Sequence, residues 1–234
     1  MFRILLGTMK NMFIIIMNAL NKDKFSVMKP HILFISLFLY LINCFGQHRV
    51  DTVIYNGVYK SYFCYELKQP LYVTYALYKG GGNCSRSSYR FTDCNSSHTA
   101  KDEDYAGSGY DKGHLANAED FAYNCEKDKK TFCYYNCLPQ TVKLNRGIWK
   151  VWEGTIRDLS HTKRIFIVTG GIYKSKTIGP GKIGVPTYCY KIVINSRTKE
   201  IIYCLLFKND DSNSVRQISL EELKGMLDYP LMPM

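Results

Sequence analysis

Three stretches in the middle of the chain decide its fold: YDKGHL at 110–115, NCLPQ at 136–140 and LNRGIWKVWE at 144–153. In the third stretch Trp149 and Trp152, together with Ile148 and Ile156, recur at the three- and four-residue spacing of a helix with one buried face. This stretch therefore predicts a helix from about Leu144 to Leu159. The first stretch carries the strongest candidate for chemistry, a histidine between charged residues and glycine.

His114 is the candidate catalytic base. A lone histidine is more often structural than catalytic, but the neighbours of this one favour chemistry. Asp111 can orient the imidazole ring, Lys112 supplies positive charge for an anion, and Gly113 lets the backbone come close to a ligand. We expect a neutral His114 to take a proton from water.

The predicted helix carries a candidate metal site. Asn145 lies in its first turn and offers a neutral oxygen to a hard cation, although a simple helix cap is the alternative interpretation. Glu153 lies eight residues later, about 80° round and about 12 Å along a regular helix, so we expect it to reach the metal through water. Arg157, one turn further on, would face an incoming phosphate. A single neutral ligand suits Mg²⁺, which keeps most of its waters.

These motifs closely resemble those of the DNA/RNA non-specific endonuclease family, the secreted sugar-non-specific nucleases related to mitochondrial endonuclease G. The resemblance continues through TGGIY at 169–173, VPTYCYK at 185–191 and SLEELKGMLDYPLMP from Ser219, and so covers nearly all of residues 47–234. It implies the ββα-metal (His-Me finger) fold and hydrolysis of phosphodiester bonds with Mg²⁺, for which Mn²⁺ would substitute.

The resemblance also implies a role for each site residue. His114 would be the general base, Asn145 the direct magnesium ligand and Glu153 a ligand through water. Arg157 would stabilise the phosphate, and Arg90 in YRFTD matches a further arginine of the family.

The chain departs from the family pattern at two positions. The usual DRGH is DKGH, so Lys112 keeps the charge but lacks the planar fork of arginine. The usual Ala-Pro after the histidine is Ala116-Asn117, and the sequence does not indicate what effect this change has.

The rest of the chain predicts an α+β fold with a central, mainly antiparallel sheet flanked by helices. We expect a meander within residues 52–79, a strand at 131–135, a buried strand at 164–171 and a hairpin at 187–207. A short helix begins at Ser219, which stands in capping-box spacing to Glu222. The long Gly-, Ser-, Asn- and Asp-rich region at 80–109 is of a kind that tends to be functional.

The first 46 residues have the pattern of a secretory signal. A basic flank at Lys29 precedes the 14 apolar-rich residues Ile32–Phe45, which are fewer than the roughly 20 that span a bilayer. We expect cleavage near Gly46, a secreted or periplasmic protein, and one nuclease domain at 47–234. Translation from Met28 and an uncleaved membrane anchor are the alternatives.

Composition excludes a disordered, collagenous or coiled-coil chain, because 46% of the 234 residues are apolar and 22% are charged. The net charge of +11 favours a polyanionic partner. Removal of residues 1–46 takes away five basic residues and one acid, so a charge of +7 remains on the mature chain.

The same cleavage leaves eight of nine cysteines, an even number that favours disulfides over zinc. If residues 195–198 form a four-residue hairpin turn, Cys189 and Cys204 face each other and are close enough to bond. Cys84 and Cys94 are candidates to close the long loop.

The sequence therefore predicts a secreted, Mg²⁺-dependent endonuclease that cleaves DNA and RNA with little sequence preference. A non-catalytic basic module that only binds nucleic acid is the alternative, as is a membrane-anchored form of the nuclease. The sequence predicts no stable membrane partner after signal cleavage, and it leaves a homodimer and a protein inhibitor open as further partners.

Overall fold

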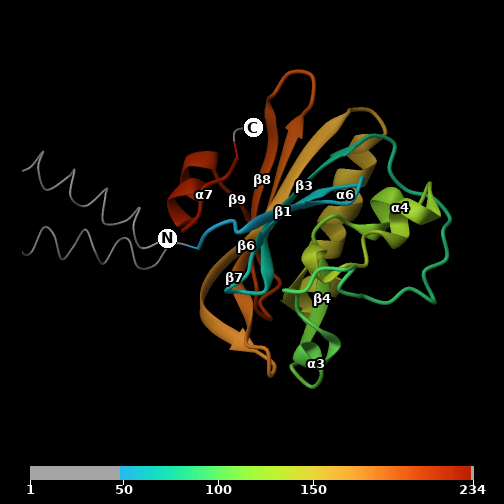
Figure 1. Ribbon diagram of the computed structural model, residues 1–234. Coiled ribbons are helices and arrows are strands. Elements are labelled where there is room, and N and C mark those ends of the chain that lie inside the picture. Colours follow the sequence, from blue (N-terminus) through green and yellow to red (C-terminus); the bar gives the residue numbers. More distant parts are fainter. Residues whose placement is uncertain (1–47, 233–234) are drawn as a thin grey trace, which may run out of the picture. The chain divides into compact units, whose positions relative to one another are not determined.

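A seven-stranded antiparallel sheet forms the centre of the structure, a computed structural model that describes residues 48–232 (Figure 1). The predicted signal peptide and the alternative start at Met28 lie outside the described residues. In spatial order the strands are β1 (Thr52–Tyr55), β2 (Lys60–Cys64), β3 (Gln69–Leu77), β6 (Ile165–Ile178), β7 (Ile183–Asn195), β8 (Ile201–Lys208) and β9 (Val215–Gln217). The predicted α+β class with a mainly antiparallel sheet is confirmed.

A smaller unit of two strands and a helix carries the central motifs. Strand β4 (Tyr110–His114) pairs antiparallel with β5 (Cys137–Thr141), and the chain continues through α5 (Val142–Leu144) and a wide turn (Asn145–Trp149) into α6 (Lys150–Ser160). In this pairing Gly113 makes room for a neighbouring side chain, because a Cβ atom there would lie 1.9 Å from Gln140 Oε1.

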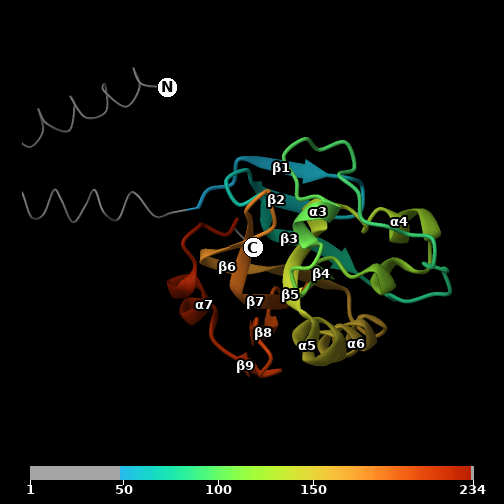
Figure 2. The ribbon, with the colours of Figure 1, turned by 90° about the horizontal axis from the view of Figure 1, so that it is seen from below.

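The helices α6 and α7 (Leu220–Met226) lie on opposite sides of the large sheet (Figures 1 and 2). Trp149 packs edge-on to Phe207 of β8 at 4.9 Å between ring centroids, and Trp152 packs on Tyr203 at 5.2 Å, which confirms the predicted buried helix face. At α7 the backbone N–H of Glu222 donates to Ser219 Oγ at 3.0 Å, so the predicted cap is also present.

The strand predicted at 131–135 is wrong. The chain forms a 3-10 turn at Tyr134–Asn136, and the strand begins only at Cys137. The buried Asn136 side chain explains this, because its amide group donates to the carbonyls of Ala116 and Thr131 and holds the segment in a turn.

The predicted Cys189–Cys204 disulfide is also wrong. Cys189 pairs with Phe207, three residues from the expected partner, because the connection between β7 and β8 is longer than a four-residue turn and β8 has an extra, bulged residue, Ile202, near its start. An odd shift in register places two side chains on opposite faces of the sheet. The buried Cys189 and Cys204 are therefore free thiols, as are Cys64 and Cys137.

Two disulfides instead fasten the long irregular region. Cys84 bonds to Cys125 at the start of α4 (Cys125–Lys129), and Cys94 bonds to Cys133. The predicted bond between Cys84 and Cys94 is therefore wrong. We call residues 84–94 the clamped loop. Its backbone is also tied to residues 132–134, because Thr92 N donates to Phe132 O and Tyr134 N to Thr92 O.

The other helical elements near the clamped loop are short. They are α3 (Asp102–Tyr105) and the 3-10 helix Ala118–Phe121. Within residues 48–232 the structure contains no helix with the length and apolar character needed to cross a membrane.

Candidate active site

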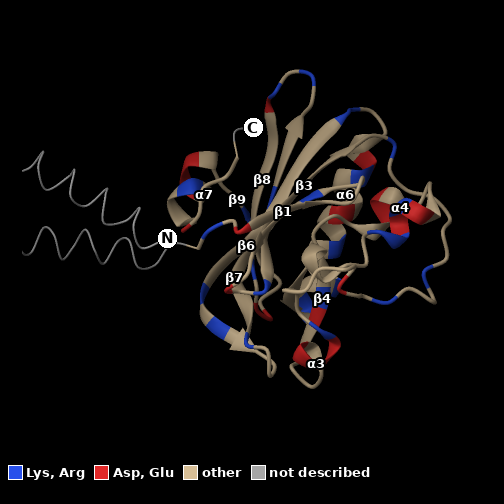
Figure 3. Ribbon diagram, in the orientation of Figure 1, with Lys and Arg blue, Asp and Glu red and all other residues tan. Residues whose placement is uncertain are grey.

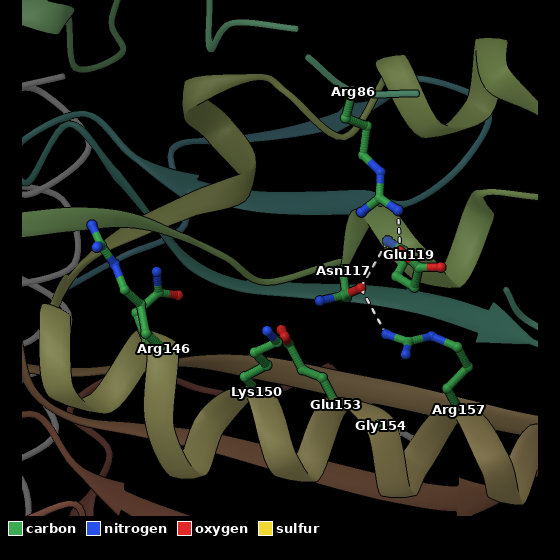
Figure 4. Close-up of a pocket in the computed structure, with 9 residues that line it drawn as sticks. Arg86, Asn117, Glu119, Arg146, Lys150, Glu153, Gly154 and Arg157 are labelled. Atoms are coloured by element: carbon green, nitrogen blue, oxygen red, sulfur yellow. Dashed lines mark hydrogen bonds and ion pairs between the residues drawn. The ribbon is translucent and has the colours of Figure 1, made fainter. Parts of the chain in front are cut away.

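A pocket of about 600 Å³ lies between α6 and the segment that follows β4 (Figure 4). Its lining residues come from the clamped loop, the segment after β4, the wide turn and α6, and they are Arg86, Asn117, Glu119, Asn145, Arg146, Lys150, Glu153, Gly154 and Arg157. Lys and Arg occur on both the clamped loop and α6 (Figure 3), and Arg86 of the clamped loop lies across the pocket from α6 (Figure 4). The pocket thus brings together three residues that the sequence singled out, namely Asn145, Glu153 and Arg157.

The Asn145 side chain is held by a carboxylate. Its Nδ2 donates to Asp111 Oδ2 at 3.0 Å, so its Oδ1 atom is left as an oxygen ligand for a cation. Arg146 donates to both oxygens of Asp111 at 2.8 Å and, with Asn145, lowers the pKa of that carboxyl group although burial opposes the shift. Asp111 therefore positions Asn145, whereas the sequence predicted that it would orient His114.

The helix that carries Asn145 and Glu153 is kinked between them. Gly147 is non-helical, and a Cβ atom there would lie 2.4 Å from Asn213 Oδ1, which accepts the backbone N–H of Ile148 at 2.7 Å. The regular-helix projection of 80° therefore does not apply. The kink lets both side chains line one pocket.

Glu153 is buried beside a buried cation. Burial raises the pKa of the carboxyl group, and Lys191 and a hydrogen bond from Asn117 oppose this shift. Lys191 Nζ lies 3.9 Å from Glu153 Oε1 and 3.9 Å from the centre of the Trp149 ring. Glu153 Oε1 is buried and has no hydrogen-bond donor in the part of the chain that the structure describes, while the Glu153 side chain lines the pocket.

Arg157 is fixed by two acceptors that come from the segment after β4. Its Nη2 donates to Asn117 Oδ1 at 3.0 Å (Figure 4). Its Nε donates to Asp120 Oδ1, also at 3.0 Å, and Tyr75 donates to the other oxygen of Asp120. Asn117 also caps the 3-10 helix by accepting the N–H of Glu119. The asparagine that replaces the family's proline thus contacts both functional residues of α6.

The arginine from the clamped loop that lines the pocket is Arg86. It forms ion pairs with Glu119 and with the buried Asp128, whose Oδ2 lies 3.3 Å from Arg86 Nε. Arg90 lies outside the pocket, where its guanidinium donates to the carbonyls of Ser87 and Tyr89. The resemblance selected Arg90 and missed Arg86, which lies four residues earlier in the chain.

His114 is half-buried and is not among the residues that line the pocket. Its ring packs against Phe91 at 4.6 Å and Phe132 at 4.7 Å between centroids, and its buried Nε2 has no hydrogen-bond partner among the described residues. Burial, with the charges of Arg86 and Lys191, lowers the pKa of His114 to about 3, so the ring is neutral at physiological pH. A neutral imidazole can accept a proton.

Lys112 is directed to another part of the surface. It forms an ion pair with Asp102 and lies over the rings of Tyr105 and Tyr134 at 5.6 and 5.4 Å. Its charge is therefore partly neutralised, and it does not line the pocket with Asn145 and Glu153. It lines a neighbouring pocket that shares Asn145 and Arg146 with the first.

The donor set fits a magnesium ion. Asn145 and Glu153 both line the pocket, and an amide oxygen and a carboxylate are ligands suited to a hard cation or its waters. Residues 48–232 contain no group of three His, Cys, Asp or Glu side chains placed to hold a metal ion, which argues against a zinc site in this region. Cys133, which could have served zinc with Cys137, is in a disulfide.

Comparisons with known proteins extend over most of this region. The sequence model of the DNA/RNA non-specific endonucleases matches residues 41–230. Mitochondrial endonuclease G of Bos taurus is 31% identical over 130 residues, which cover 50% of this chain and 44% of that protein. The mitochondrial nuclease EXOG of Xenopus laevis is 32% identical over 159 residues, with 56% and 44% covered. The chain thus spans less than half the length of these two relatives.

A solved structure has the same fold. A chain in the crystal structure of the EndoG/EndoGI complex, which was solved to explain EndoG inhibition, superposes with a TM-score of 0.68 at 24% identity. The match covers 80% of this chain and 88% of that chain. The predicted ββα-metal fold is confirmed, and the match of the sequence model to 41–230 shows that the chain belongs to the DNA/RNA non-specific endonuclease family.

Proposed function

We propose that the protein is an Mg²⁺-dependent endonuclease that hydrolyses phosphodiester bonds of DNA and RNA with little sequence preference. The observation that carries this proposal is one pocket in which oxygen ligands for a metal face two arginines suited to a phosphate. Asn145 would hold the ion directly and Glu153 through water. Bound Mg²⁺ would polarise the phosphate and stabilise the leaving oxygen.

Each protein residue then has a defined task. Arg157, fixed by Asp120 and Asn117, and Arg86, fixed by Glu119, would bind the phosphate oxygens and stabilise the charge that develops on them. Neutral His114 would take the proton of the attacking water. Entry of an anionic phosphate would raise the pKa of His114 from its low value and make it a stronger base.

Backbone and phosphate contacts supply no sequence preference. The sequence contains no base-reading motif, and the pocket is lined mainly by charged and amide side chains. The proposal therefore includes both DNA and RNA as substrates. The basic charge of the chain would gather either polymer and make activity fall with salt.

The test is to incubate the purified protein with supercoiled plasmid and with RNA, with Mg²⁺ or with EDTA. We expect cleavage of both polymers with Mg²⁺ and none with EDTA. His114→Ala and Asn145→Ala should each lower the rate at least about 100-fold. Full cleavage by His114→Ala, or in EDTA, would disprove the mechanism, and binding without cleavage by the parent protein would favour the non-catalytic module.

We further propose that the protein is exported to an oxidising compartment. The leader-like sequence before residue 47 supports this, as do the two disulfides that hold the clamped loop. Fractionation of producing cells, with mass spectrometry of the unreduced protein, should find it outside the reducing cytoplasm with both disulfides formed. Recovery as a reduced cytoplasmic protein would contradict the proposal.

A further inference from the structure

A second pocket, of about 500 Å³, lies beside α4 and the clamped loop on the rim of the molecule. Arg90, Lys129 and Lys130 contribute positive charge to its lining, and Glu126 contributes one negative charge. Phe132 and Tyr135 form an aromatic part of the wall, next to the Cys94–Cys133 disulfide. The pocket therefore combines a net positive charge with apolar surface.

The three cations are available to an external anion. All three residues are exposed, and within residues 48–232 none of them has a carboxylate at ion-pair distance. Arg90 Nη1 donates to two carbonyls of its own loop, which fixes the side chain without neutralising its charge. The charges on α4 and the neighbouring loop thus lack internal partners.

The second pocket adjoins the candidate active site. Phe132 lines it, and the same ring packs against His114 at 4.7 Å between centroids. The clamped loop also serves both places, because it carries Arg86 into the first pocket and Arg90 into the second. α4 and the clamped loop lie side by side in both views (Figures 1 and 2). One bound polymer can therefore reach both pockets.

We propose that the second pocket binds a neighbouring part of the nucleic-acid strand that is cleaved in the first. Arg90, Lys129 and Lys130 bind its phosphates, and Phe132 offers an aromatic surface to a base or sugar. Basic grooves with aromatic surfaces are the usual means of holding single strands without sequence preference. The inference rests on the proposed function, since it assigns an extended binding site to the same substrate.

The test compares a long and a minimal substrate in the full chain. The triple variant Arg90→Ala/Lys129→Ala/Lys130→Ala is matched with Lys174→Ala/Arg197→Ala/Lys224→Ala, which removes the same charge from exposed positions outside both pockets. Binding of a fluorescent single-stranded DNA is measured by anisotropy in a His114→Ala background at several salt concentrations. Hydrolysis of a p-nitrophenyl phosphodiester of thymidine is measured with His114 intact.

We expect the pocket variant to bind the oligonucleotide about ten-fold more weakly than the matched control, with a salt slope smaller by about 2 for the three lost phosphate contacts. Hydrolysis of the minimal substrate should stay within about two-fold of the parent, because that substrate fills only the first pocket. The inference would be overturned if both triple variants lost the same affinity for the oligonucleotide. It would also be overturned if the pocket variant lost as much activity on the minimal substrate as it lost in oligonucleotide affinity. Failure of the parent to cleave anything would refute the proposed function, while the binding comparison would still decide the second pocket.

Discussion

The two walls of the candidate active site are held in place by different means. The α6 wall carries Glu153 and Arg157 on a regular helix that is held on the large sheet by Trp152 and by Trp149 directly before it. The opposite wall carries Arg86 on the clamped loop, which has little regular structure and is fastened by two disulfides. Burial of apolar surface therefore fixes one wall, and covalent bonds fix much of the other.

Because they are held by different means, the two walls should lose their structure under different conditions. A helix packed on a core moves only when the core is disrupted, because its position is shared among many contacts. A loop without a core of its own depends on few restraints and becomes mobile when these are removed. The protein should therefore lose the geometry of Arg86 under conditions that leave α6 and its residues intact.

The largest effect is expected at Arg157. Arg157→Ala should lower the rate of cleavage about 100- to 1,000-fold, because it removes a fixed cation from the phosphate and leaves Asp120 buried without that partner. Arg157→Lys should recover little, since one ammonium group cannot replace donors to both Asp120 and Asn117. Steady-state kinetics and thermal unfolding check both variants. Recovery to near the parent rate by lysine would show that the two fixed contacts are unimportant.

Removal of the disulfides should have the next largest effect. The double substitution Cys84→Ser/Cys125→Ser should lower the free energy of unfolding by about 2–4 kcal/mol and the rate by about ten-fold or more at a temperature where the protein stays folded. The control is the same substitution in an Arg86→Ala background. If the disulfide acts by placing Arg86, removing it from the Arg86→Ala variant should lower the cleavage rate little further. An equal fall in rate with and without Arg86 would contradict this role.

Acid stability should depend on His114, whose ring is enclosed by Phe91 of the clamped loop. The pKa is about 3 in the folded state and near 6.5 when unfolded, so the unfolded chain binds the extra proton between these values. Stability from this group is complete above about pH 6.5 and is lost as the pH falls toward 3, by at most about 1.4 kcal/mol per pH unit.

The measurement is urea unfolding of the parent and of His114→Gln from pH 7 to 4. The parent should lose more stability than the variant, and the difference should shrink when Cys84→Ser/Cys125→Ser loosens the loop. Parallel curves for parent and His114→Gln would show that the histidine is not buried as the structure places it.

The smallest effect is expected at Asn117. Asn117→Ala should lower activity about ten-fold or less, because Arg157 keeps Asp120 while losing one acceptor, and Glu153 loses one donor. Asn117→Pro restores the usual residue of the family and removes the same contacts. The control is Asp158→Ala, on the exposed side of α6. If the cleavage rates of all three variants were alike, the contacts of Asn117 would have no particular importance for activity.

Sequence patterns with a local physical cause were predicted well. The spacing of Trp149 and Trp152 identified the buried face of the helix, and the spacing of Ser219 and Glu222 located the cap of α7. The resemblance identified the ββα-metal fold and the family. Asn145, Glu153 and Arg157 were selected and do line one pocket.

The errors concern relations between segments. The prediction that Cys189 and Cys204 face each other depended on the length of one turn. A register shift of three residues places them on opposite faces of the sheet instead. The kink at Gly147 depends on Asn213, about 65 residues away in the chain, and the helix pattern contains no sign of it. Arg86 was missed because a loop without periodic structure gives no indication of which arginine points inward.

The sequence by itself determined the family, the main elements and the residue types that chemistry requires, because these follow from local spacing and from motifs along the chain. Only the tertiary structure decided that Asp111 holds Asn145, that Asn117 joins Arg157 to Glu153, and that disulfides bring Arg86 to the pocket. These contacts join residues from different elements. Their geometry is set by packing, register and cross-links, which no single stretch of sequence contains.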